Sequence, residues 1–127
     1  MVTAFSELSA KNGAWTPARK WQTYSTMNVI LDLCIVPIGV GVSLSSYVAA
    51  CEMVLNDAGL KTVLHANGSN IEGEWDKVFA AVRRCHEVVH DMGASRIFTV
   101  MKVGTRTDRS QTMDEKTQSV KSKLASL

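Results

Sequence analysis

The segment from His65 to Gly73 holds the densest group of side chains that could bind a ligand, and it reads His-Ala-Asn-Gly-Ser-Asn-Ile-Glu-Gly. Its imidazole, amide, hydroxyl and carboxylate groups can donate and accept hydrogen bonds, and Glu72 can pair with a nitrogen of a heterocycle. Its glycines allow the backbone to approach a ligand closely. We therefore take His65, Asn67 and Glu72 as candidate ligand-binding residues. The alternative is a polar hairpin that binds nothing.

A second pattern, His86-Glu87-Val88-Val89-His90, matches the HExxH motif of zinc proteases. In those enzymes the two histidines bind the metal and the glutamate acts as general base. A zinc site needs a third protein ligand, and His65 is the only other histidine of the chain. His86 also falls within an apolar helical stripe between Val82 and Val89. We therefore expect packed or surface histidines, with no metal site and no catalytic residue.

Two loops carry further polar groups. The glycine- and serine-rich stretch 39–46 leads into a helix, where Ser43 or Ser45 can cap the first turn, and capping is favoured over an anion site. The stretch 103–109 ends a strand with two guanidinium groups and an acid. Arg106 and Arg109 could form an ion-pair network at a subunit contact or face a ligand, and both alternatives stay open.

The elements that must position these groups follow from hydrophobic patterns and turn signals. Strands are predicted at 28–37, 60–66, 69–72 and 96–103, and Asn67-Gly68 is a hairpin turn signal. One helix is predicted from the serines to Gly59, a second from Trp75 to Met92, and a polar tail helix at about 111–124. The order βαββαβ predicts an α+β, ferredoxin-like fold: a four-stranded antiparallel sheet with two helices on one face, plus a C-terminal helix.

The first predicted strand is apolar on both of its sides. Val29, Leu31, Leu33 and Ile35 alternate with Ile30, Cys34 and Val36. A strand buried on both faces needs a layer over the face that the helices leave open. We expect a second subunit to supply that layer, so that two sheets meet face to face.

Length and composition exclude several classes of protein. The 127 residues fit one domain, predicted at 28–127 and preceded by an N-terminal extension, 1–27, whose aromatic residues fold back onto the domain or a neighbouring subunit. A net charge of +2 does not indicate nucleic-acid binding, and the longest apolar stretch is too short to span a membrane. Three widely spaced cysteines favour a reducing compartment. We expect a cytoplasmic protein, and the N-terminal extension keeps mitochondrial targeting open as an alternative.

Four pieces of sequence, in this order and spacing, resemble a known family. They are Pro37-Ile38-Gly39, Ser43-Leu44-Ser45-Ser46-Tyr47-Val48, Gly68-Ser69-Asn70-Ile71-Glu72-Gly73 and Val103-Gly104-Thr105-Arg106-Thr107-Asp108. The chain resembles the small, YkoF-like thiamine-binding proteins over residues 28–124. The resemblance implies a ferredoxin-like fold, dimers formed across the sheet faces and dimers paired into homotetramers. It also implies binding of thiamine or its hydroxymethylpyrimidine part, without known catalysis.

The resemblance assigns pocket roles to Ser43 and Ser45 at the helix start and to Ser69 and Glu72 in the hairpin. With His65 and Asn67 they form the predicted ligand-binding set. The expected function is non-catalytic binding of thiamine or its pyrimidine precursor near a subunit interface, as a carrier, store or sensor; no other cofactor, no nucleic acid and no membrane partner is expected. The alternative is an oligomeric structural or regulatory module without a small-molecule ligand.

Overall fold

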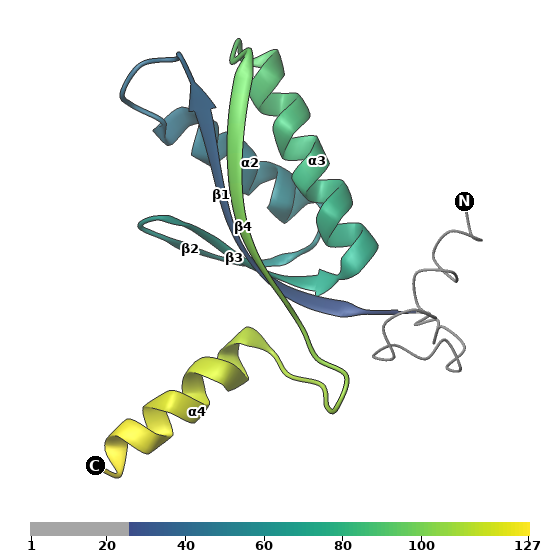
Figure 1. Cartoon of the computed structure of the whole chain (residues 1–127), viewed down its shortest axis with the longest axis vertical. Helices are drawn as coiled ribbons and strands as arrows, with labels where there is room; N and C mark the ends of the chain where they lie inside the picture. Colours follow the sequence, from purple (N-terminus) through teal and green to yellow (C-terminus); the bar gives the residue numbers. More distant parts are fainter. Residues whose placement is uncertain (1–25) are drawn as a thin grey trace, which may run out of the picture.

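The computed structural model describes residues 26–127, which form a four-stranded antiparallel sheet with two helices packed on one face (Figure 1). The elements are β1 (Asn28–Ile38), α2 (Ser45–Asp57), β2 (Lys61–His65), β3 (Gly68–Glu74), α3 (Trp75–Asp91), β4 (Arg96–Thr105) and α4 (Met113–Ala125). The strands lie in the order β2-β3-β1-β4. The predicted α+β, ferredoxin-like fold is confirmed. The N-terminal extension 1–27 falls almost wholly outside the described residues. The predictions about its contacts and about mitochondrial targeting therefore stay predictions.

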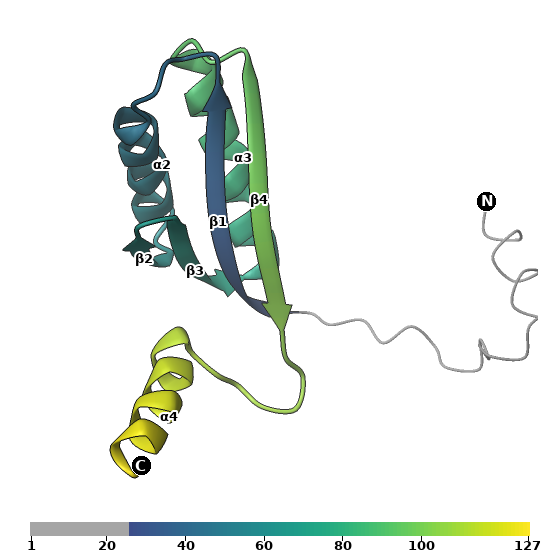
Figure 2. The same cartoon turned by 60° about the vertical axis from the view of Figure 1, so that its left-hand side comes forward.

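The core lies between the sheet and the two helices α2 and α3, which cover the same face (Figure 2). Val29, Leu31 and Leu33 alternate along β1 and are almost fully buried there. The apolar stripe of α3 packs against them, with Val78, Val82, Cys85 and Val89 buried. Glu74 is the N-cap residue of α3. Its backbone is extended, and its carboxylate accepts the Lys77 N–H at 3.1 Å.

The start of α2 differs from the prediction. Leu44 occupies the N-cap position with a helical backbone, and no side chain caps the first turn. Ser45 is already the first residue of the helix, and Ser43 lies outside it. The predicted serine cap is therefore wrong, because a capping side chain needs an extended backbone at the N-cap position, and that position belongs to an apolar residue here.

The opposite face of the sheet has no covering layer of its own within residues 26–127. On this face the strand register pairs Cys34 and Val36 of β1 with Val100 and Phe98 of β4, and Ile30 with Gly104. Phe98 is 61% exposed and Val100 51%, whereas the helix-facing residues of β1 are buried. Below, "open face" denotes this side of the sheet. Its apolar content agrees with the two-sided apolar pattern of the first strand.

The tail helix α4 is attached at its first turn and extends away from the sheet (Figures 1 and 2). Thr112 and Glu115 form a capping box, in which each side chain accepts the other residue's backbone N–H. Met113 is buried, while Val120 and Leu124 farther along are more than half exposed. In the described part of the chain, no helix is long and apolar enough to cross a membrane.

We expect Gly73→Ala to lower the stability of the fold by about 1–3 kcal/mol, because the added methyl group overpacks the core. A Cβ at this position would lie 2.7 Å from Leu60 Cδ2 and 3.2 Å from Val78 Cγ2. The control is Gly104→Ala, whose new methyl group would be 3.7 Å from the nearest atom, the Ile30 carbonyl oxygen. Urea unfolding of the two variants measures the difference. Equal midpoints would show that Leu60 and Val78 move aside freely.

Candidate functional site

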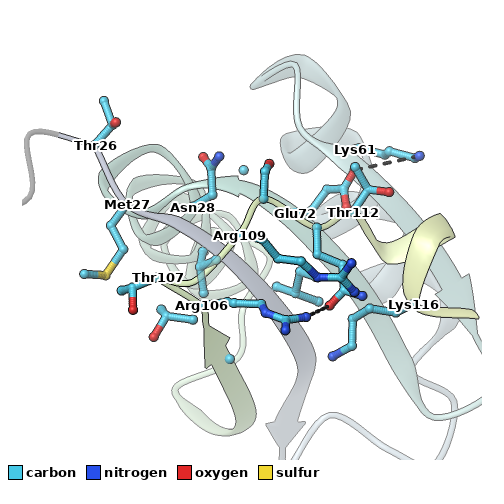
Figure 3. Close-up of a pocket in the computed structure, with 17 residues that line it drawn as sticks. Thr26, Met27, Asn28, Lys61, Glu72, Arg106, Thr107, Arg109, Thr112 and Lys116 are labelled. Atoms are coloured by element: carbon cyan, nitrogen blue, oxygen red, sulfur yellow. Dashed lines mark hydrogen bonds and ion pairs between the residues drawn. The ribbon is translucent and has the colours of Figure 1, made fainter. Parts of the chain in front are cut away.

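A cavity of about 970 Å³ lies where β1 begins and where β3 and β4 end (Figure 3). Its wall comprises the first residues of β1, the ends of β3 and β4, the segment between β4 and α4, and the first turn of α4. Asn28, Thr105, Thr107 and Thr112 contribute polar groups to this wall. The size is in the range of small-molecule sites. Elements far apart in sequence thus border an open cavity large enough for a heterocyclic ligand.

Glu72 is the acidic residue of the cavity wall. Its side chain is 17% exposed, and its Oε2 accepts the backbone N–H of Met113 at 2.6 Å. Its Oε1 lies 3.7 Å from Lys61 Nζ on the neighbouring strand. The carboxylate therefore joins β3 to the start of α4. A carboxylate has two oxygens with several acceptor positions, so Glu72 keeps capacity for a ligand that donates a hydrogen bond.

Lys61 was not singled out in the sequence, and the predicted turn at Asn67-Gly68 would place it opposite Glu74. The hairpin turns one residue earlier, at Ala66-Asn67 with His65 opposite Gly68, and this register puts Lys61 directly opposite Glu72. Its ammonium group also donates a hydrogen bond to Asp114, which raises the pKa of Lys61. Lys61 and Glu72 together hold the first turn of α4 against the sheet.

Arg106 is bound by neighbours from its own loop. Its Nε and Nη2 donate to the two carboxylate oxygens of Asp108 at 2.6 and 2.8 Å, and its Nη1 donates to Gln111 at 2.9 Å. The guanidinium group lowers the pKa of Asp108 to about 2. Arg109 and Lys116 line the same cavity. Lys116 was also missed, because its place depends on how α4 docks, which sequence patterns do not encode.

His65 and Asn67 lie at the hairpin end and do not line this cavity. The Asn67 backbone N–H donates to His65 Nδ1 at 3.2 Å, so the proton of a neutral ring must be on Nε2. That nitrogen lies 2.7 Å from Asp32 Oδ1 on the open face. His65 therefore connects the hairpin to the central strand β1.

Ser69 faces the other side of the sheet from Glu72, because the two are three positions apart on one strand. It is 5% exposed, and its hydroxyl donates to Glu52 of α2. Ser43 and Ser45 are exposed at the far end of β1. Within one chain, the six predicted residues are thus spread over several places, and of these only Glu72 lines the cavity. As a ligand-binding set they stay a prediction.

The HExxH residues serve the packing of α3. His86 Nε2 lies 2.7 Å from the Thr99 hydroxyl on β4, and His90 Nδ1 lies 2.7 Å from the Ala94 carbonyl oxygen. Glu87 pairs with Arg83 and Arg84 on its own helix. The two histidines and the glutamate of the motif are thus bonded to different neighbouring residues. In the described range, 26–127, no three His, Cys, Asp or Glu side chains are grouped to hold a metal.

Comparison with known proteins agrees with the fold and the sequence pattern. A family model described as thiamine-binding protein matches residues 31–121. A UPF0045 protein of Synechocystis is 62% identical over 104 residues, covering 82% of this chain and 86% of its own length. A UPF0045 protein of Eremothecium gossypii is 39% identical over 102 residues, covering 80% of this chain and 97% of its own.

Solved structures show the same fold. A hypothetical protein of Methanocaldococcus jannaschii superposes with a TM-score of 0.70 at 28% identity, covering 74% of this chain and 96% of its own. A Thermotoga maritima protein, described as a candidate for thiamine biosynthesis or salvage, superposes with a TM-score of 0.63 at 16% identity, covering 73% and 98%. By the family model and these relatives, the chain belongs to the thiamine-binding protein family.

Proposed function

We propose that the protein binds thiamine or its hydroxymethylpyrimidine part in the cavity around Glu72, as a non-catalytic carrier, store or sensor. The observation that carries the proposal is a mostly buried carboxylate in a cavity of about 970 Å³, in a chain of the thiamine-binding family. An aminopyrimidine presents an amino donor and ring nitrogens, and the acceptor oxygens of Glu72 complement that donor. The description of the Thermotoga protein points to the same chemistry.

Self-association belongs to the same proposal. Ile30, Lys61, Glu72 and Gly104 line the cavity from the open face, so a subunit that covers this face lies next to the ligand. The exposed apolar residues Phe98 and Val100 favour a second copy of this chain as the covering layer. The proposed assembly is a homotetramer of two sheet-to-sheet dimers. The three free thiols support the cytoplasm as its compartment.

The test is isothermal titration of the purified protein with thiamine and with hydroxymethylpyrimidine. We expect Glu72→Gln to weaken binding roughly 10- to 100-fold, because a hydrogen bond to a charged group contributes about 1.5–3 kcal/mol. Glutamine keeps an oxygen that can accept the Met113 N–H, so α4 stays attached. The matched control is Glu74→Gln, which lies two residues along β3 and does not line the cavity.

The competing candidate is an oligomeric regulatory module without a ligand. The bonds of Glu72 to Lys61 and Met113 favour it, because they give Glu72 a structural role that needs no ligand. Thermal unfolding separates the two functions. A ligand that binds only the folded state adds roughly 2.7 kcal/mol of stability at a hundredfold excess over its Kd. Unchanged melting with both compounds, in a well-folded oligomer, would leave the module as the better description.

A further inference from the structure

Positive side chains gather on one wall of the cavity. Arg106 and Arg109 come from the segment after β4, and Lys116 comes from the first turns of α4 (Figure 3). These three residues are far from Glu72 in sequence, but all four side chains line the same space. The cavity therefore combines a carboxylate with a cationic wall.

The cations differ in whether they already have an acidic partner. Lys61 is paired with Glu72 and Asp114, and Arg106 is paired with Asp108 through two nitrogen atoms. Arg109 and Lys116 form no ion pair with any residue of the described range. Two positive groups in the wall thus remain available for an anionic ligand.

Most backbone donors at the N-terminus of α4 are already in use. The Thr112 and Met113 N–H groups donate to Glu115 and Glu72, and the Glu115 N–H donates to the Thr112 hydroxyl. Side chains are therefore the main groups that can hold an anion here. Arg109 offers the planar set of donors that suits phosphate oxygens, and Lys116 offers a compact positive charge.

Free thiamine carries a permanent positive charge on its thiazolium ring, which two unpaired cations disfavour. The two cations favour a phosphate ester of thiamine instead, since phosphate adds about −1.5 to −2 charges near neutral pH and three acceptor oxygens. We propose, on the basis of the function proposed above, that the cavity selects the phosphorylated form of the ligand, with Arg109 and Lys116 binding the phosphate. The aminopyrimidine lies toward Glu72.

The experiment compares thiamine with thiamine monophosphate by isothermal titration, at low and at physiological ionic strength. We expect the monophosphate to bind at least tenfold more tightly, with a preference that shrinks as salt screens the charges. Arg109→Gln and Lys116→Gln should each reduce the preference several-fold, because each weakens monophosphate binding and removes a positive charge that disfavours the thiazolium ring. Inorganic phosphate should compete with the monophosphate and leave thiamine binding unaffected.

The matched controls are Arg96→Gln at the start of β4 and Lys123→Gln, which lies two helical turns beyond Lys116. Neither control residue lines the cavity, so both variants should keep the full preference. Equal affinity for thiamine and its monophosphate would overturn the phosphate site and leave the proposed function standing. A preference that survives loss of both Arg109 and Lys116 would also overturn it. Binding of neither compound would remove the proposed function as well.

Discussion

Leu33→Glu is expected to prevent the chain from folding. Leu33 is 4% exposed and lies in the core between β1 and the helices. A carboxylate there has no partner, and burying an unpaired charge costs several kcal/mol. Since domains of this size are stable by only about 5–15 kcal/mol, the variant should lose most or all of its stability. Circular dichroism with urea titration measures the loss.

The control for this variant is Leu64→Glu. The register places Leu64 in the same cross-strand row as Leu33, on the same face of the sheet, with Ser69 between them. Leu64 lies on the edge strand β2 and is 59% exposed, so its replacement should cost less than about 1 kcal/mol. A Leu33→Glu protein with the unfolding midpoint of the Leu64→Glu control would contradict the assignment of faces on β1.

Local patterns suffice to predict the elements of this fold. Alternation along β1 separates the residues that face the helices from those on the open face. The hairpin was also predicted, although it turns at Ala66-Asn67, one residue before the predicted Asn67-Gly68. Gly68 also meets a steric requirement there, since a Cβ would lie 2.5 Å from the Leu33 carbonyl oxygen. The alternation and the turn involve residues close in sequence, whereas the contact between Gly68 and Leu33 joins strands far apart in sequence. The predicted serine cap of α2 was wrong. The N-cap position belongs to Leu44, whose backbone is helical, and no side chain caps the first turn.

The site is harder to predict because its parts come from segments far apart in sequence. Glu72 was identified from its polar segment, whereas Lys61 was missed, because only the observed turn at Ala66-Asn67 brings it opposite Glu72. The place of Lys116 depends on the docking of α4, which is held by Met113, Asp114 and their partners on the sheet. Ser69 shows that two residues of one strand can be close in sequence and still face different sides of the sheet. It is close to Glu72 in sequence, yet it faces α2 from the other side of the sheet.

Assembly of the subunits is expected to depend on the apolar residues of the open face. Phe98→Asp should reduce the proposed tetramer to a smaller species while the single chain stays folded. Phe98 is 61% exposed within one chain, so an aspartate there remains hydrated until a second sheet covers it. Covering it would bury an unpaired charge in an apolar interface. Light scattering of the purified variant gives the mass of the assembly, and circular dichroism shows whether the fold persists.

Met53→Asp provides the matched comparison, because Met53 is 66% exposed on α2, on the helical layer and not on the open face. The same substitution type at similar exposure should leave the mass unchanged if the sheets form the interface. If Met53→Asp dissociates the assembly and Phe98→Asp does not, the subunits meet through their helices. The open face would then have to be covered by something other than a second sheet. A cavity lined from that face would lie away from the subunit contact, and ligand binding would be independent of assembly.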